Sequence, residues 1–531
     1  MLNIETKAGN NRKVAGKWNI SLLSSKLFLE GPIPKGSWIL ALRRTYLDKL
    51  AELVGTTEKL PYYFYDLHTK VSFDPTAYDR ISLSGFLSRD VIAPSKVRPG
   101  AAGGGDLYWA NHALAIKWQR IVNPKLFSTT LFVKSGYRAR FVYGRGGMEL
   151  PNYADNEIDD IGITTDFTYF ASQQHSIKFG IGLKSLKFNN TLIPTPVDTA
   201  LSYHNLSYYS AFYLQDERQV RIRKRTPIVI SAGVRFSHFS SGNYFRLSPR
   251  IGIKYLISDD LAVKAAWGHY YQFFSIPSFG DELLERNFVA VTCLPWYSAD
   301  KNLKPAYGTH YILGIEKWIS SNENLSIEAY HKNMHNVLEI RSFPAEEKFV
   351  SKGIGYARGL ELLYKKKNNF ISYAYSVTKR EFDGVSFYPA HDCRHRLNLA
   401  WNFPLLKKWS LSIRWIYNTG LPYTGVIGYY QYVEFVSEIE GLPFDKDLYW
   451  ESISGRRGNF RLPTYHRLDV SLAREFKVFS VNLTAYVQII NLYNRKNYSY
   501  IYYDYSKNPP KIVGGDPMLP RLPSIGIMGE F

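Results

Sequence analysis

The stretch from His395 to Gly420 decides the fold; it reads HRLNLAWNFPLLKKWSLSIRWIYNTG. In its first half every second residue from Leu397 to Phe403 is apolar, and the residues between them are polar or small. The same alternation runs from Trp409 to Tyr417, where only Ile416 breaks it. A period of two is typical of antiparallel strands with one apolar and one polar face, so the stretch predicts two strands joined by a tight turn.

Similar alternating segments follow one another along nearly the whole chain. They predict strands near residues 14–24, 26–31, 37–46, 61–71, 79–87, 107–121, 126–140, 157–170, 175–188, 206–219, 227–239, 244–257, 260–273, 306–319, 323–336, 354–365, 369–379, 394–403, 408–418, 464–475, 478–492 and 521–531. The total is about 22, an even number within the range of single-chain outer-membrane barrels.

The connections between these segments alternate in length. After even-numbered strands they are mostly short, as in VNPK and SDD, whereas most odd-numbered strands are followed by long ones, such as 274–305, 419–463 and 493–520. An up-and-down meander in an outer membrane has this pattern, with short turns on the periplasmic side and long loops outside the cell.

The direction of the apolar face follows from the size of the ring. A closed sheet of about 22 strands is too wide for side chains to fill, so an inward apolar face would line water. The apolar face must therefore contact lipid, and residues such as Asn398 and Arg414 must face the lumen. The sheet must also close, because an open edge in hydrocarbon leaves unpaired backbone groups. The predicted fold is an all-β, transmembrane, antiparallel up-and-down β-barrel.

Composition excludes several other classes. No Pro, Gly or Ser-rich linker divides the 531 residues, and no apolar run reaches the ~18 residues of a membrane-spanning helix. A soluble propeller should repeat every ~40–50 residues, and no such repeat is visible. The net charge of +20 is spread along the chain without a recognition helix, which argues against nucleic-acid binding. A positive lumen would instead favour anionic solutes.

One short motif, HDCRH from His391 to His395, contains residue types that bind metals. Adjacent residues at the start of a strand rarely converge on one ion, so we expect Asp392, Arg394 and His395 to form a polar cluster instead. Cys293 and Cys393 allow at most one disulfide. No Ser, His and Asp arrangement can be assembled from the sequence, so we expect no catalytic residues, no metal, no cofactor and no enzyme activity.

The long loops are rich in aromatic residues, which are the candidates for ligand binding. They are Trp296, Tyr297, Tyr498, Tyr500, Tyr502 and Tyr503. Their rings could stack on planar or sugar ligands, or they could extend the interfacial aromatic girdle above the bilayer. The sequence leaves both roles open.

Several motifs, in this order, resemble the barrel of TonB-dependent outer-membrane receptors. They are LEGPIPKGSWILALRRTYLD (Leu29 to Asp48), FRLSPRIGIKY with LAVKAAWGHYYQF (Phe245 to Phe273), YARGLELLY, HDCRHRLNLAW, YHRLDVSLAREF and VQIINLYNRKNY. The final strand, RLPSIGIMGEF, ends in Phe531. A terminal aromatic on an alternating strand is similar to the family's signal to the barrel-assembly machinery.

The resemblance covers nearly the whole chain and implies a function. The family imports scarce nutrients, such as siderophores, cobalamin, glycans or peptides, across the outer membrane of Gram-negative bacteria. A plug domain precedes the family's barrel and ends in a strand similar to LNIETKAG, Leu2 to Gly9. We therefore expect residues 1–10 to be a remnant of the last plug strand and residues 11–531 to be the barrel.

This chain would then be a truncated form without plug, coupling box or signal peptide. Its expected partners are outer-membrane lipid, a small nutrient and the assembly machinery, with a TonB-type energy-coupling protein acting only through the missing N-terminal region. The alternative function is a passive porin or structural barrel that needs no energy input.

Overall fold

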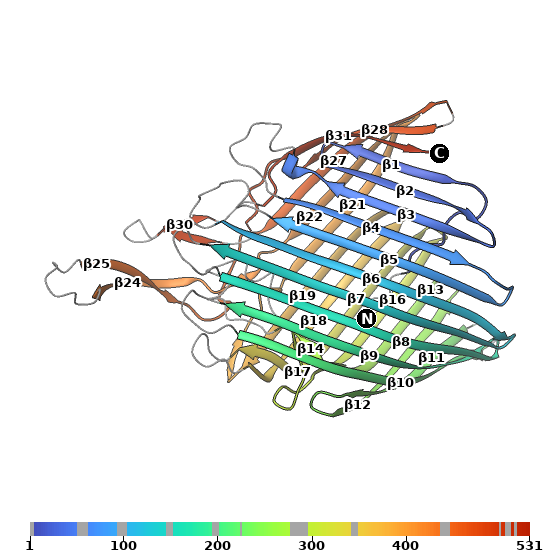
Figure 1. The fold of residues 1–531 in the computed structure, drawn as a ribbon, viewed down its shortest axis with the longest axis horizontal. Helices are drawn as coiled ribbons and strands as arrows, with labels where there is room; N and C mark the ends of the chain where they lie inside the picture. Colours follow the sequence, from blue (N-terminus) through green and yellow to red (C-terminus); the bar gives the residue numbers. More distant parts are fainter. Residues whose placement is uncertain are drawn as a thin grey trace.

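The protein is a closed antiparallel β-barrel of 22 strands, as the sequence predicts (Figure 1). The computed structural model describes residues 5–49, 62–92, 104–144, 152–193, 201–223, 226–276, 296–340, 349–435, 446–479, 481–498, 501–504, 511–514 and 518–531. Within these ranges, no helix has both the length and the apolar character needed to cross a membrane.

The wall of the barrel follows the chain order. Its strands are β1 (Ala15–Ser21), β2 (Ser24–Ile33), β3 (Gly36–Thr45), β4 (Tyr62–Phe73), β5 (Asp79–Ile92), β6 (Gly104–Asn123), β7 (Leu126–Gly144), β8 (Asn152–Ser172), β9 (His175–Ile193), β10 (Leu201–Arg223), β11 (Thr226–Phe239), β12 (Tyr244–Ser258), β13 (Leu261–Gln272), β16 (Ala306–Ser320), β17 (Glu323–Ile340), β18 (Phe349–Lys366), β19 (Asn369–Phe382), β21 (His395–Leu406), β22 (Trp409–Asn418), β27 (Tyr465–Val478), β28 (Val481–Ile490) and β31 (Leu522–Glu530). Short β20 (Val385–Phe387) extends the edge of β19.

The ring closes where the last strand meets the first. β31 pairs with β28 on one side and with β1 on the other, so the main sheet has no free edge in the membrane. Phe531 completes the seam: its backbone N–H and C=O exchange hydrogen bonds with Gly16, at 3.1 and 3.2 Å. A Cβ on Gly16 would lie 2.4 Å from the Phe531 ring, so the glycine makes room for the terminal aromatic.

The strand register builds one continuous apolar surface from the alternating residues. Trp415 lies opposite Leu399 on β21 and Leu468 on β27, and Ile413 lies opposite Val470. On the other face of the same strands, Arg414 lies opposite Asp469. This distribution is the one expected of a barrel with lipid outside and water inside. We call the polar face the lumen face.

Several strands are longer than the alternating pattern predicts. The segment expected at 206–219 is β10, which runs from Leu201 to Arg223. About 9–11 residues suffice to cross a bilayer, so β10 continues well beyond the membrane. The extra residues include SYHN, which has no regular apolar face, and the backbone ladder with β9 extends through them. Backbone pairing therefore continues where the side-chain pattern stops.

The turn predicted after residue 475 begins a few residues later in the structure. β27 continues to Val478, and Phe479 begins the turn with a positive φ of 53°. Lys477 and Val478 still pair with β28. The backbone hydrogen bonds between the strands do not depend on the apolar alternation, so the strand continues after the alternation has ended. Pro404, expected in a turn, instead lies inside β21 next to a register shift, where a missing N–H is tolerated.

The long loops contain additional strand pairs that the sequence pattern does not predict. They are β14 (Phe274–Ser275) with β15 (Tyr297–Ser298), β23 (Pro422–Tyr423) with β26 (Phe460–Arg461), β24 (Val426–Phe435) with β25 (Lys446–Ser454), and β29 (Tyr502–Asp504) with β30 (Lys511–Gly514). The β24–β25 hairpin projects away from the barrel at the end that carries the long loops (Figure 1). We call this the loop end, and the opposite end the turn end.

Candidate functional site

The segment from Trp296 to Pro305 lies against the lumen face at the loop end. Its anchor is an aromatic cluster, which we define by its buried residues Leu186, Phe188, Phe239, Phe273 and Ala299. The Phe239 and Phe273 rings stack with their centroids 5.0 Å apart. Leu186 and Phe188 alternate along β9 with lipid-side residues, of which Ile181 and Leu183 are about half exposed. The cluster therefore fixes the loop segment from inside the barrel.

Hydrogen bonds hold the same segment across several strands. Asn190 of β9 donates to the backbone oxygen of Trp296 at 2.5 Å, and the hydroxyls of Tyr203 and Ser298 lie 2.8 Å apart. At its other end, the Asn336 amide of β17 donates to the oxygen of Pro305 at 3.2 Å. The segment thus spans the lumen wall from β9 to β17.

This packing determines how the predicted ligand-binding residues Trp296 and Tyr297 are placed. The Trp296 ring lies 5.9 Å from Phe274, and the Tyr297 ring lies 4.9 Å from Tyr203. Both side chains are partly buried. The structure brings these two residues together at the mouth of the lumen, where each packs against another ring and keeps part of its surface accessible.

The other predicted aromatic residues lie in a separate loop. Tyr498 is partly buried and faces Gly514 of β30, where a Cβ would meet its ring at 3.5 Å. Tyr502 and Tyr503 belong to β29, opposite Gly514 and Ile512. Tyr500 is outside the described residues.

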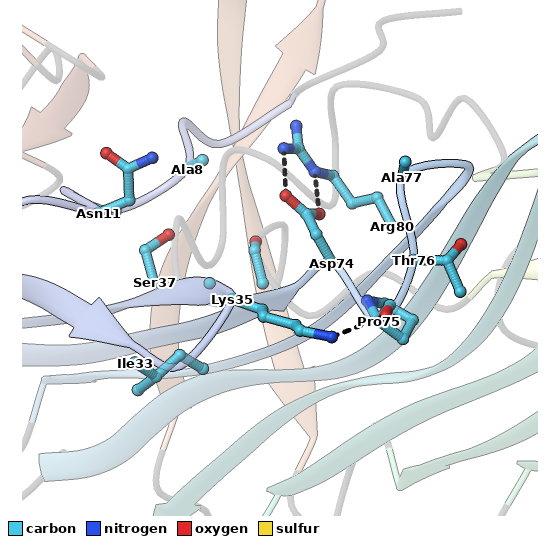
Figure 2. Close-up of a pocket in the computed structure, with 13 residues that line it drawn as sticks. Ala8, Asn11, Ile33, Lys35, Ser37, Asp74, Pro75, Thr76, Ala77 and Arg80 are labelled. Atoms are coloured by element: carbon cyan, nitrogen blue, oxygen red, sulfur yellow. Dashed lines mark hydrogen bonds and ion pairs between the residues drawn. The ribbon is translucent and has the colours of Figure 1, made fainter.

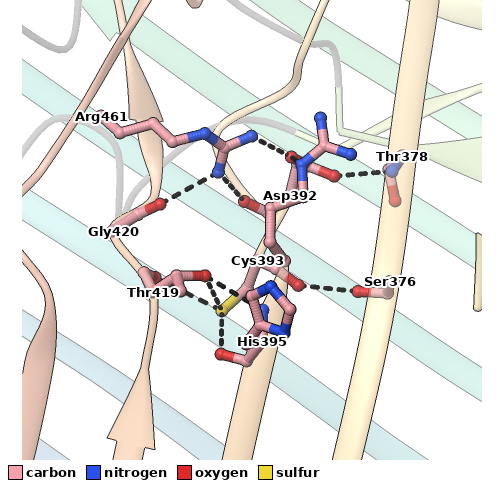
Figure 3. A network of polar contacts seen from close by, with 9 residues as sticks. Ser376, Thr378, Asp392, Cys393, His395, Thr419, Gly420 and Arg461 are labelled. Carbon is pink, nitrogen blue, oxygen red and sulfur yellow. Dashed lines mark hydrogen bonds and ion pairs between the residues drawn. The ribbon is translucent and has the colours of Figure 1, made fainter. Parts of the chain in front are cut away.

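A second loop segment, 419–464, is held by a buried carboxylate. Asp392 is completely buried, and its Oδ2 accepts a hydrogen bond from the Arg461 guanidinium at 2.5 Å (Figure 3). The same oxygen forms an ion pair with Arg394 at 3.1 Å. Its Oδ1 accepts from the backbone N–H of Thr378 on β19 at 2.6 Å. Arg461 also donates to the backbone oxygen of Gly420, so it ties both ends of the 419–464 segment to the wall.

A second buried carboxylate repeats this arrangement on β17. Glu339 is 1% exposed and pairs with Arg457 at 3.1 Å and Arg380 at 3.8 Å. Asn336 has a positive φ of 54° at a register shift in β17, and this bulge changes the side-chain alternation just before Glu339. The sequence did not predict a role for Glu339, Arg457 or Arg461. No local pattern connects residues so far apart, although a charged residue close to an apolar run, as in NVLEI, is a weak signal.

The HDCRH motif forms the expected polar cluster only in part. Asp392 and Arg394 pair, as predicted, whereas the His395 ring turns away and bonds the Tyr373 hydroxyl at 2.8 Å. Cys393 is a free, buried cysteine whose sulfur lies 3.4 Å from the backbone oxygen of Thr419. Cys293 lies outside the described residues. Among the described side chains, no group of three His, Cys, Asp or Glu could hold a metal ion.

Residues 5–10 lie on the lumen face near the turn end. Glu5 pairs with Lys117 of β6 at 2.5 Å, Lys7 pairs with Glu30 of β2 at 2.9 Å, and Lys70 of β4 donates to the Thr6 oxygen at 2.7 Å. The hydrogen bond from Lys117 and its charge lower the pKa of Glu5. The expectation that residues 1–10 are part of a plug strand stays a prediction.

A cavity of about 510 Å³ opens beside this segment (Figure 2). It lies between Ala8 and Gly9 on one side and the two turns that contain Lys35 and Asp74 on the other. Arg80 donates two hydrogen bonds to Asp74, both at 2.7 Å, and lowers the pKa of that carboxyl. The cavity is thus framed by turn residues that already have partners.

Comparison with known families agrees with this architecture. A family model described as "TonB dependent receptor-like, beta-barrel" matches residues 45–492. The chain belongs to the TonB-dependent receptor family. A search of curated protein sequences finds no match. Proteins of this family are transporters rather than enzymes.

Solved TonB-dependent receptors share the fold. The ferric-catecholate import receptor Fiu from E. coli K12 aligns with a TM-score of 0.66 at 11% identity, over 99% of this chain and 83% of Fiu. BauA, the ferric preacinetobactin receptor of Acinetobacter baumannii, aligns with a TM-score of 0.65 at 10% identity, over 99% of this chain and 81% of BauA. The FrpB iron transporter of Neisseria meningitidis aligns with a TM-score of 0.64 at 11% identity, over 99% of this chain and 82% of FrpB. At these identities the likeness concerns the fold alone.

Proposed function

We propose that the protein is an outer-membrane receptor that captures a scarce nutrient at its loop end and passes it through the lumen to the periplasm. The observation that carries this proposal is the family match over residues 45–492 on a closed barrel whose loops fold onto the lumen wall. The candidate nutrients are a siderophore, cobalamin, a glycan or a peptide. The residues proposed to contact the nutrient are Trp296, Tyr297, Tyr498, Tyr500, Tyr502 and Tyr503. The proposed location is the outer membrane of a Gram-negative bacterium.

We also propose Phe531 as the residue that the barrel-assembly machinery recognises. Its backbone is tied into the closing seam, while its side chain remains 47% exposed. Energy for import would come from a TonB-type protein of the inner membrane. A passive porin, the alternative function, would conduct solutes without this protein.

The test is uptake by cells that produce the protein together with the TonB system of its own host. Radiolabelled ferric siderophores of the catecholate, hydroxamate and carboxylate classes, cobalamin and an oligosaccharide would be supplied at nanomolar concentration. We expect one of them to accumulate saturably, and a protonophore to abolish its accumulation. Linear uptake of several small solutes that resists the protonophore would support the porin instead and overturn the proposal.

A further inference from the structure

Two arginines lie side by side on the lumen face of β11 and β12. Arg235 is opposite Ser248 in the register, and Arg250 is opposite Gly233, so the two side chains are diagonal neighbours on one face. The other face of these strands carries the lipid-exposed residues, including Phe236, Leu247 and Ile251, which are 45%, 57% and 43% exposed. Arg235 and Arg250 therefore point into the lumen.

A carboxylate three strands from Arg235 in the register already has another donor. Asp166 of β8 accepts a hydrogen bond from the Tyr213 hydroxyl of β10 at 2.7 Å. The Tyr213 ring crosses β9 above Gly180, where a Cβ would approach the ring at 2.7 Å and the Asp166 carboxylate at 2.5 Å. Arg235 lies over the Tyr213 ring, 5.7 Å from its centroid. The Tyr213 ring thus lies between Arg235 and Asp166, and its hydroxyl already occupies that carboxylate.

Neither arginine forms a hydrogen bond or an ion pair within the part of the chain that the structure describes. Other lumen cations on this side of the barrel do: Lys184 pairs with Asp160 at 2.5 Å, and Lys264 pairs with Glu316. The Nε atoms of Arg235 and Arg250 are shielded from solvent and lack an acceptor among the described residues. A guanidinium that lacks an ion pair gains free energy when a carboxylate binds it.

The chemistry of the pair selects the ligand. A guanidinium presents a planar fork of donors that matches the two oxygens of a carboxylate. Phe239, of the aromatic cluster, is four residues from Arg235 along β11, which is about 13 Å towards the loop end. The arginine pair therefore lies deeper in the lumen than the loop-end aromatic cluster.

We propose that Arg235 and Arg250 form a carboxylate-binding subsite on the lumen wall, which takes a small polycarboxylate or the carboxylate arm of a larger nutrient. This inference rests on the proposed function, because it places the subsite on the import path. The Tyr213–Asp166 hydrogen bond positions the ring against which Arg235 lies. Gly180 leaves the space that this arrangement needs.

The test uses the full chain, purified and folded in detergent, with radiolabelled tricarballylate, a tricarboxylate, as the probe in equilibrium dialysis. The variants are Arg235→Gln, Arg250→Gln and the double variant. Lys264→Gln is the matched control, because it removes the same charge from the same wall but from a paired cation. Faster migration of the unheated protein than of the boiled protein on gels would confirm that each variant is folded.

We expect saturable binding that weakens at least tenfold in the double variant and changes less than twofold in Lys264→Gln. Absence of saturable binding to the unaltered protein would overturn the subsite, as would an equal loss in the control variant. Because dialysis needs no energy source, its result is independent of the uptake experiment. If the cells take up none of the nutrients but the protein binds tricarballylate, only the proposed function fails. If the cells take up a nutrient but the protein does not bind tricarballylate, only the subsite fails.

Discussion

Gly180 shows how a single residue determines side-chain geometry on the lumen wall. A Cβ at this position would lie 2.5 Å from the Asp166 carboxylate and 2.7 Å from the Tyr213 ring. Gly252 differs, because its Cβ would meet nothing closer than 3.9 Å. The two glycines lie on neighbouring parts of the wall and provide a matched comparison.

We predict that Gly180→Ala destabilises the barrel by about 1–3 kcal/mol, because Tyr213 and Asp166 must move apart. Gly252→Ala should be neutral or slightly stabilising, since an alanine restricts the unfolded chain more than a glycine does. Urea unfolding in lipid vesicles, followed by tryptophan fluorescence, measures both. Equal effects of the two substitutions would show that the close contacts at Gly180 have no energetic importance.

The two buried carboxylates, Asp392 and Glu339, hold one element of the loop end, the 419–464 segment. We predict that Arg461→Met or Arg457→Met costs about 1–3 kcal/mol, because each leaves a buried carboxylate with one fewer donor. Limited proteolysis should also cut within 419–464 sooner than in the unaltered protein. Arg80→Met is the control: Asp74 and Arg80 are 40% and 54% exposed, and such pairs contribute under about 1 kcal/mol. If Arg461→Met and Arg457→Met are cleaved no faster than the unaltered protein, the carboxylates do not hold the segment.

The segment 5–10 should respond to pH. The pKa of Glu5 lies below its ordinary value of 4.5 when Lys117 binds it, so the contact is fully formed above pH 4.5. It is lost as the pH falls through the lowered pKa, because the protonated carboxyl no longer attracts Lys117. Hydrogen exchange of residues 5–10 should therefore lose protection on acidification, after correction for the pH dependence of the intrinsic exchange rate. Lys117→Met should abolish the change; a change that persists in this variant would assign it to another group.

At the same scale, the sequence predicts the wall strands better than the connections. Alternation over Leu397–Phe403 and Trp409–Tyr417 locates β21 and β22, because the apolar residues of both strands lie on one face of the wall. It cannot locate the β24–β25 hairpin or the 296–305 segment, because neither is part of the lipid-facing wall. The role of Glu339 and Asp392 as anchors of the 419–464 segment was also beyond prediction, since Arg457 and Arg461 come from distant parts of the chain. Trp296 and Tyr297 could be selected by composition, but their packing partners could not.

For the molecule as a whole, the account depends on the apolar face contacting lipid and the lumen face contacting water. The opening stretch supplies adjacent positions on one strand: Leu411 and Ile413 on the lipid side, Ser410 and Ser412 on the lumen side. Ser412 accepts a hydrogen bond from Asn402 at 3.0 Å, and cysteine replaces serine with little change in shape. The four positions therefore sample both faces at nearly the same height.

The most direct measurement introduces one cysteine at a time at these four positions, with Cys293 and Cys393 replaced by serine, and labels it with an environment-sensitive fluorophore in vesicles. We predict that nitroxides on the lipid chains quench the label at Leu411 and Ile413, whereas iodide in the water quenches it at Ser410 and Ser412. Quenching by iodide at all four positions, or the reverse alternation, would contradict the barrel with a lipid-facing apolar surface and an aqueous lumen.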